Sequence, residues 1–254
     1  MATGGLVGYW GLDETSGTVA NDLTKYGNTG TYVGSPTLNV APPAALTFPS
    51  RAVTFNGSSQ YVNIAATPFK SLIYTSGSSW IKHPNAVTAG ERIMVSGTGS
   101  SGDVTWYLNS ASSMGLTLDN NSPVTVTVTG LSLGDGNWHH LAFTYDGSLG
   151  SNNISVYVDG TLKANGNQTG ALKIPSTNNT TIASYGATNY FNGSIDDVRI
   201  YNRALTSGEI SGLYAGSIQP LAGAWSVVRG NPSGVGANKY SVIKGSASAY
   251  SQIK

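Results

Sequence analysis

Hydrophobic and polar residues alternate with a period of two in short runs between residues 6 and 201, and turn-forming residues separate these runs at intervals near ten. Such alternation predicts β-strands that each bury one face. Many short strands at this spacing predict an antiparallel sandwich of two sheets. The expected strands are 6–12, 51–55, 61–64, 79–82, 92–96, 105–109, 114–118, 124–129, 138–145, 154–158, 161–165, 180–184 and 193–201.

Turn-forming residues predict how some of these strands are connected. Asn56-Gly57 and Asp159-Gly160 are strong signals for tight turns, so each is expected to close a hairpin between its flanking strands. Residues 15–34 are rich in turn chemistry. Residues 35–49 contain four prolines and little alternation, which predicts a surface excursion.

The period changes after the last strand, and apolar residues of segment 205–214 recur at spacings of three and four. Thr206 and Ser207 are candidate N-caps, and Gly216 is a candidate stop signal. The pattern predicts a helix of about two turns directly after the last core strand.

One acidic residue of the last strand stands out. Strict alternation places Asp196 on the same face as Val198 and Ile200, which are aliphatic and therefore predicted to face the core. A buried carboxylate without a partner is costly, so Asp196 is expected to have one.

Composition and charge narrow the range of functions. The chain has no cysteine, which excludes disulfides, thiolate nucleophiles and Cys-ligated zinc. Residues 1–216 carry a formal charge of −3 and residues 217–254 carry +4. Four separated basic residues are too few for a nucleic-acid footprint, so no nucleic-acid partner is expected. No apolar run approaches 20 residues, so no membrane insertion is expected either.

Five motifs between residues 6 and 216 carry a resemblance to a known family. They are Gly8-Tyr9-Trp10 with Leu12-Asp13-Glu14, Phe55-Asn56-Gly57 with Tyr61-Val62, Trp80-Ile81-Lys82, Trp138-His139-His140-Leu141 with Tyr157-Val158-Asp159-Gly160, and GSIDDVRIYNRAL at 193–205. Their order resembles the laminin-G-like and pentraxin-like jelly rolls of the concanavalin A-like lectin and glucanase superfamily. The expected fold is therefore an all-β, two-sheet antiparallel jelly-roll sandwich over residues 1–216, with one short helix after the last core strand.

Residues 217–254 match nothing in that family but resemble themselves. The segment 225–230, WSVVRG, recurs as YSVIKG at 240–245. Each copy reads as a strand end, which predicts a small basic β-hairpin-like appendage. Such strands either pack on the body or pair with another chain, in which case 217–254 mediates self-association or anchoring.

The resemblance also implies a structural Ca²⁺. In related jelly rolls such an ion is held by a carboxylate of the last core strand and by backbone carbonyls. Asp196 would supply the side chain, Asn56 or Gly57 a carbonyl, and the segment around Asp13 the remaining ligands. Oxygen donors suit Ca²⁺. The alternative is that Asp196 accepts backbone N–H groups without a metal.

Hydrolysis is not expected. The glucanases of the superfamily place two glutamates two residues apart on each side of an aspartate, and glycoside hydrolysis needs such paired carboxylates. Glu14, Glu91 and Glu209 are the only glutamates here, and none has a carboxylate two or four residues away. The chain is predicted not to be an enzyme.

Aromatic residues in or beside loops remain as binding candidates. Trp106, Tyr107, Tyr185 and Tyr190 could stack on sugar rings, although each could equally pack in the core. They favour a non-catalytic, extracellular carbohydrate- or surface-binding (adhesion) module whose partner is a glycan or cell-surface polysaccharide. The alternative is a structural subunit of a phage virion, fibre or extracellular filament, in which the jelly roll is a spacer and residues 217–254 mediate assembly.

Overall fold

The computed structural model describes residues 4–46, 50–68, 72–84, 87–88, 90–97, 104–119, 122–172, 179–186 and 188–218. The chain divides into two compact units, Met1–Ile218 and Gln219–Lys254. The second unit, with the predicted basic appendage, lies outside the described residues. Its hairpin therefore stays a prediction.

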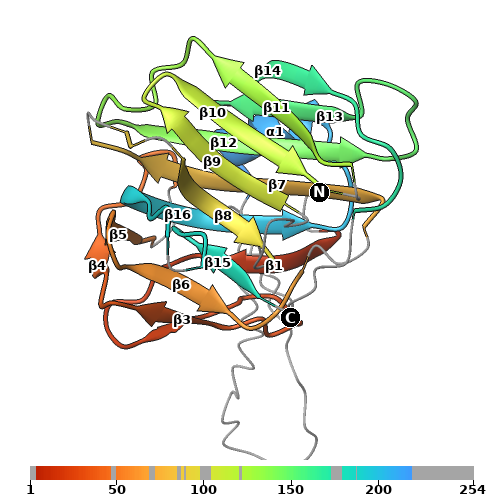
Figure 1. The fold of residues 1–254 in the computed structure, drawn as a ribbon. Coiled ribbons are helices and arrows are strands. Elements are labelled where there is room, and N and C mark those ends of the chain that lie inside the picture. Colours follow the sequence, from red (N-terminus) through yellow and green to blue (C-terminus); the bar gives the residue numbers. More distant parts are fainter. Residues whose placement is uncertain are drawn as a thin grey trace, which may run out of the picture. The chain divides into compact units, whose positions relative to one another are not determined.

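The first unit is a sandwich of two antiparallel sheets (Figure 1). Sheet A has the spatial order β14 (Thr161–Gly166), β13 (Ile154–Val158), β12 (Trp138–Asp146), β7 (Tyr74–Lys82), β16 (Asn192–Tyr201), β5 (Ala52–Asn56) and β4 (Thr37–Val40), with β1 (Leu6–Trp10) also paired to β16. Sheet B has the order β11 (Val124–Thr129), β10 (Ser113–Leu118), β9 (Val104–Ser110), β8 (Glu91–Ser96), β15 (Thr180–Ile182), β6 (Tyr61–Ile64), β3 (Gly30–Val33) and β2 (Val19–Ala20). The predicted all-β sandwich is confirmed.

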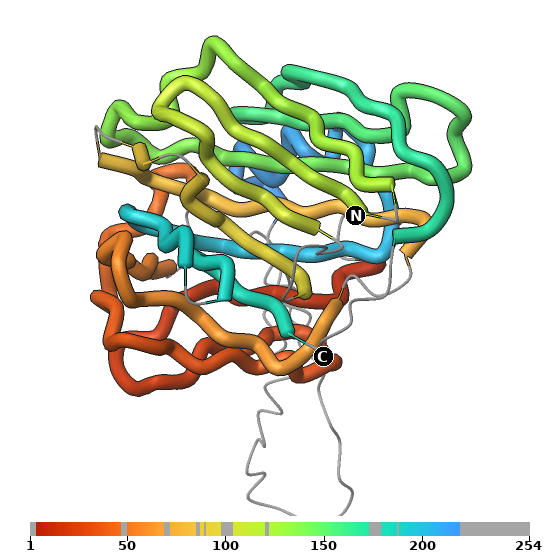
Figure 2. Tube along the Cα trace, viewed as in Figure 1, coloured from red at the N-terminus to blue at the C-terminus, as the bar shows by residue number. Residues whose placement is uncertain are grey.

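The main core lies between the inner faces of the two sheets. Apolar side chains from nearly every strand meet there, and the ring of Trp106 stands edge-on to Phe143 of the opposite sheet at a centroid distance of 5.5 Å. The first and last strands of the unit, β1 and β16, lie side by side (Figure 2). Pairing between distant parts of the sequence therefore closes the fold.

The two predicted hairpins have different outcomes. Val158 of β13 pairs with Thr161 of β14, so Asp159-Gly160 closes a hairpin as expected. The prediction of a hairpin around Asn56-Gly57 is wrong, because β5 belongs to sheet A and β6 belongs to sheet B. An Asn-Gly pair specifies a tight turn but not the sheet that the next strand joins.

The sequence pattern missed three short strands at or near the sheet edges. Strands β2 and β3 lie in the stretch that reads as turn-rich, and β4 lies within the proline-containing excursion. These strands have two to four residues, which is too short for alternation to register.

A β-bulge in β16 changes the predicted orientation of Asp196. The register of β16 against β7 shifts between Asp196 and Arg199, and Asp197 has a φ of +55°. The extra residue resets the alternation, so Ile195 and Val198 both face the core. Asp196, which follows Ile195, therefore points away from the core, and its predicted grouping with Val198 and Ile200 is wrong.

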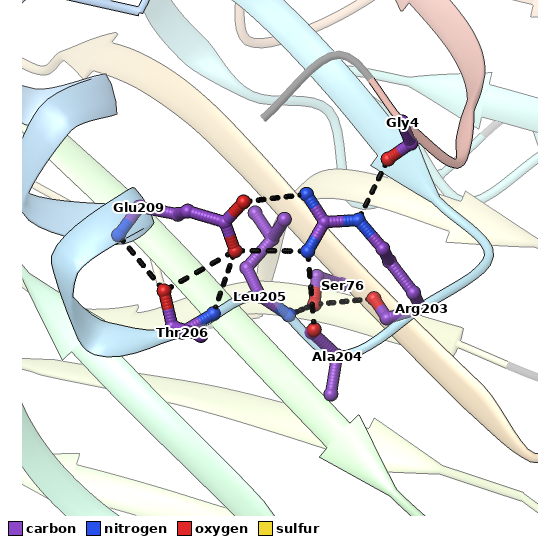
Figure 3. Close-up of polar contacts among 7 residues, drawn as sticks. All are labelled: Gly4, Ser76, Arg203, Ala204, Leu205, Thr206 and Glu209. Atoms are coloured by element: carbon purple, nitrogen blue, oxygen red, sulfur yellow. Dashed lines mark hydrogen bonds and ion pairs between the residues drawn. The ribbon is translucent and has the colours of Figure 1, made fainter. Parts of the chain in front are cut away.

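The predicted helix is present as α1 (Ser207–Tyr214). Figure 3 shows its N-terminus, where the Thr206 hydroxyl accepts from the Glu209 amide and the Glu209 carboxylate accepts from the Thr206 amide. The same carboxylate pairs with Arg203 at 2.7 Å, and Arg203 Nε donates to Gly4 O. This capping box fixes where the helix begins.

Helix α1 covers part of the outer face of sheet A. Its buried residues Ile210 and Leu213 pack with Leu205 against Tyr157 and Tyr201 of the sheet in a second, smaller apolar cluster. The outer face of sheet A is therefore partly closed. Sheet B has no helix over its outer face among the described residues.

A histidine bridges two aspartates near the beginning of β12. His139 Nδ1 lies 2.9 Å from Asp159 Oδ2, and Nε2 lies 3.1 Å from Asp135 Oδ1. Only the imidazolium form can donate from both nitrogens. The hydrogen bond to Asp159 is the main cause that raises the pKa of His139, against an opposing effect of burial.

We expect this bridge to make stability depend on pH. Because the folded state raises the pKa of His139, the bridge stabilises fully below the unfolded pKa of about 6.5 and is lost as pH rises through the folded value. Chemical denaturation between pH 5 and 9 should show this component in the wild type and lose it in His139→Gln. An unchanged pH profile in that variant would contradict the assignment.

Candidate functional site

Arg92 and Tyr107 face each other on the outer side of sheet B. They are register partners on β8 and β9, and the guanidinium carbon of Arg92 lies 4.6 Å from the ring centroid of Tyr107. The Tyr107 ring lies over Gly115 of β10, where a Cβ atom would come within 2.4 Å of the ring. The glycine therefore gives the ring room to lie on the sheet.

The segment between β15 and β16 brings two more tyrosines to the same end of sheet B. The Tyr185 ring centroid lies 5.7 Å from the Arg92 guanidinium, and the Tyr190 ring lies 6.1 Å from Tyr61 of β6. The amide of Arg92 donates to Asn189 O, which ties this segment to β8. Tyr61, Arg92, Tyr107, Tyr185 and Tyr190 are all half-buried, and we call them the tyrosine cluster.

A buried carboxylate holds the surroundings of the cluster in place. Glu91 Oε2 accepts from the Asn192 amide at 2.9 Å and lies 2.8 Å from His83 Nε2. Its Oε1 accepts from the Thr88 amide at 2.7 Å. The carboxylate thus connects the start of β8, next to Arg92, with the residue after β7 and with the start of β16, two residues after Tyr190. We infer that it keeps the cluster in one arrangement.

Three of the four predicted aromatic residues come together in this cluster, namely Tyr107, Tyr185 and Tyr190. Trp106 does not, because its side chain is fully buried in the core, and its prediction as a ligand-binding residue is wrong. Adjacent residues of a strand face opposite sides, so Trp106 and Tyr107 could not share one surface. Sequence reasoning missed Arg92 and Tyr61. Alternation could have indicated Tyr61, because it directly precedes Val62 and therefore alternates with Val62 and Ile64, which face inward.

The second predicted site is centred on Asp196, on the outer face of sheet A. Its carboxyl is fully buried, and Oδ2 accepts from Ser50 Oγ at 3.3 Å. Oδ1 has no hydrogen-bond partner among the described residues. Burial, and then the neighbouring charges of Asp197 and Asp13, raise the pKa of Asp196 to about 9. A negative charge at this position requires compensation.

The structure brings Asp13 to this site but not Asn56 or Gly57. Asn56 pairs with Asn192, four residues before Asp196 on the same strand, which corresponds to roughly 13 Å. The Asn56 side chain accepts from the amides of its own turn. Their prediction as ligands next to Asp196 is wrong because antiparallel pairing places the end of β5 at the beginning of β16.

The donors near Asp196 are oxygen atoms, which fits a hard cation. Ser50 and Asp13 contribute a hydroxyl and a carboxylate, while Asp197 is engaged by Arg199 at 2.8 Å. No group of three or more acidic or histidine side chains converges on one point in the part of the chain that the structure describes. A cation here would have two carboxylates, Asp196 and Asp13, and would need further oxygen ligands from backbone or water.

Residues 56–211 match the family model described as the concanavalin A-like lectin/glucanases superfamily, and the chain belongs to this family. This is the class that the two-sheet jelly roll defines. A comparison with curated protein sequences found no match.

Solved structures with the same fold include several binding domains. Domain 4 of an extracellular arabinanase from Geobacillus stearothermophilus, in complex with arabinotriose, has 22% identity and a TM-score of 0.60, and the match covers 82% of this chain and 98% of that one. The botulinum neurotoxin serotype G binding domain has 17% identity and a TM-score of 0.64, over 82% and 50% of the chains. A Trypanosoma rangeli sialidase in complex with sialic acid has 18% identity and a TM-score of 0.60, over 85% and 33%.

The TM-scores show a common fold, and at these identities the likeness shows the fold alone. The match spans half of the neurotoxin domain and a third of the sialidase. Among the described residues, no helix is both long and apolar enough to cross a membrane.

Proposed function

We propose that this protein is a non-catalytic, extracellular carbohydrate-binding module and that the tyrosine cluster binds the glycan. The observation that carries this proposal is the placement of Arg92 against two half-buried tyrosine rings, Tyr107 and Tyr185, together with the Tyr61–Tyr190 ring pair at the same end of sheet B. Tyrosine rings offer apolar faces to the C–H groups of sugars and hydroxyls to their polar groups. A small set of polar groups among aromatic side chains is the usual composition of a ligand site.

The roles of the three glutamates support a binding module over a hydrolase. Glu14 accepts from Asn21 and Tyr32, Glu91 pairs with His83, and Glu209 pairs with Arg203 and caps α1. Each therefore has a structural role. A glycosidase needs two carboxyl groups about 5–10 Å apart on either side of the scissile bond.

The relatives give the proposal further support. The arabinanase domain was solved with bound arabinotriose, and the match to this chain covers 98% of that domain. The neurotoxin domains are named as binding domains. The alternative role as a virion, fibre or filament subunit depends on residues 217–254, which lie outside the described residues.

Glycan binding is testable with wild-type protein and a Tyr185→Ala/Tyr190→Ala double variant on an array of plant, bacterial and animal polysaccharides. Losing two stacked rings should weaken binding about 10- to 100-fold, since each aromatic contact contributes about 0.5–1.5 kcal/mol beyond its buried area. Tyr26→Ala is the matched control, because Tyr26 is an exposed tyrosine outside the cluster. The proposal fails if the wild type binds no polysaccharide or if the double variant binds as well as wild type.

We also propose that Asp196 and Asp13 hold a structural Ca²⁺. The supporting observation is the buried Oδ1 of Asp196, which has no partner among the described residues, beside a second carboxylate and a hydroxyl. The ion would compensate the buried negative charge and connect β16 to the segment after β1. Calcium-dependent unfolding of wild type and Asp196→Asn tests this proposal.

A further inference from the structure

We infer that the tyrosine cluster selects glycans that carry an anionic group, and that Arg92 recognises this group. The inference rests on the proposed function and specifies its ligand. The chemistry in question is a carboxylate or a sulfate ester on a sugar, both of which accept hydrogen bonds from a guanidinium.

Arg92 is held in a fixed position on the outer face of sheet B. Its guanidinium lies between the rings of Tyr107 and Tyr185, at 4.6 and 5.7 Å from their centroids. Nη1 donates to Gly90 O at 2.7 Å, and the backbone amide donates to Asn189 O. A cation that is pre-positioned between two rings loses little conformational entropy when a ligand binds.

The side chain of Arg92 still has hydrogen-bonding capacity. Its Nε is buried and has no partner among the described residues, and Nη2 makes no hydrogen bond to them either. Five donor hydrogens in a planar fork suit two oxygens of one anionic group. An anion that approaches along the free edge of the guanidinium would meet Nη2 first.

The positive charge of Arg92 is not neutralised by the protein around it. No described carboxylate forms an ion pair with it, and its sequence neighbour Glu91 faces inward to His83. The two tyrosine rings beside it are uncharged at neutral pH, and burial lowers the pKa of Arg92. The outer positions on the surrounding strands are uncharged, namely Thr31, Asn63, Thr105, Asn109, Ser113, Thr117, Thr125, Thr127 and Thr129.

An uncompensated, partly buried cation attracts an anion more strongly than a solvated one does, because the local dielectric constant is lower. The flanking rings and the hydroxyl-rich strands favour an anion that belongs to a sugar. A sugar ring can stack on Tyr185 while its hydroxyls bond to the threonine and serine side chains.

The test uses pairs of glycans that differ only in charge. We expect wild-type protein to bind an oligogalacturonate at least about tenfold more tightly than its methyl ester in calorimetry at low salt, and rising salt should reduce this preference. A sulfated galactan and its desulfated form make the second pair. If only one pair shows a preference, that pair identifies the anionic group as carboxylate or sulfate.

Variants at Arg92 assign the preference to that residue. Arg92→Gln should bind the acid and its ester about equally, and Arg92→Lys should retain part of the preference because it keeps the charge but not the planar fork. Arg203→Gln is the matched control, because Arg203 lies at α1, outside the cluster. Thermal melts show whether each variant is folded, and the lysine variant provides the test if Arg92→Gln does not fold.

The outcomes separate this inference from the proposed function. Equal wild-type affinity for charged and uncharged forms, or a preference that persists in Arg92→Gln, overturns the inference while tyrosine-dependent glycan binding stands. Glycan binding that is unchanged in Tyr185→Ala/Tyr190→Ala overturns the proposed function instead. Failure of the wild type to bind either member of both pairs overturns the inference.

Discussion

Replacing Trp106 with alanine is expected to lower the free energy of unfolding by about 3–5 kcal/mol, as is usual for truncating a large buried aromatic side chain. Trp106 is 0% exposed and packs edge-on against Phe143 across the sandwich. The truncation would leave a cavity between the two sheets, because the surrounding side chains can relax into the vacated space only in part. Trp106→Phe should cost less, because it retains most of the ring.

The adjacent residue is the control for this prediction. Tyr107→Ala removes a half-buried ring from the outer face, so it should weaken glycan binding while changing the free energy of unfolding by only about 1 kcal/mol. Urea denaturation measures the first effect and glycan titration the second. If Trp106→Ala unfolds like wild type, or if both variants lose stability equally, the assignment of the two faces of β9 is incorrect.

Calcium is expected to stabilise the wild-type protein strongly and to have little effect on Asp196→Asn. At a calcium concentration about 100-fold above the dissociation constant, the gain is about 2.7 kcal/mol, which corresponds to roughly 5–10 °C in melting temperature for a unit of this size. The reason is that an ion bound only to the folded state adds its binding free energy to stability. Asparagine keeps the shape of the side chain but removes its charge.

Thermal melts with calcium and with a chelator measure this difference. Asp146→Asn is the matched control, since Asp146 is a half-exposed aspartate whose carboxylate accepts from Ser148 in its own turn. It should retain the full calcium effect. A calcium effect of the same size in Asp196→Asn, or none in the wild type, would contradict the proposed metal site.

Local patterns predicted local structure well. The predicted helix forms as α1 with Thr206, one of the two capping candidates, as its N-cap, and the Asp159-Gly160 turn joins β13 to β14. These features depend on residues within a few positions of one another, so their physics is contained in short segments. The family motifs also identified the jelly roll, and residues 56–211 match the family.

Long-range pairing explains where the predictions were wrong. Asn56-Gly57 makes a turn, but β5 and β6 each pair with a strand more than a hundred residues away, β16 and β15, and these strands belong to different sheets. The same pairing separates Asn56 from Asp196. Alternation with a period of two does not reveal the bulge at Asp197, because nothing in the residue types marks which residue of the strand is the extra one.

The sequence by itself determined the fold class and the terminal helix. It also pointed to the tyrosines of the segment between β15 and β16 as binding candidates. Only the tertiary structure decided which aromatic residues share a surface, because that depends on which face of each strand meets the other sheet. It also decided that Arg92 lies between Tyr107 and Tyr185, three residues that no local spacing connects. The site is built from residues of β6, β8 and β9 of one sheet and of the segment before β16, and the register of these strands is set by burial of the opposite face.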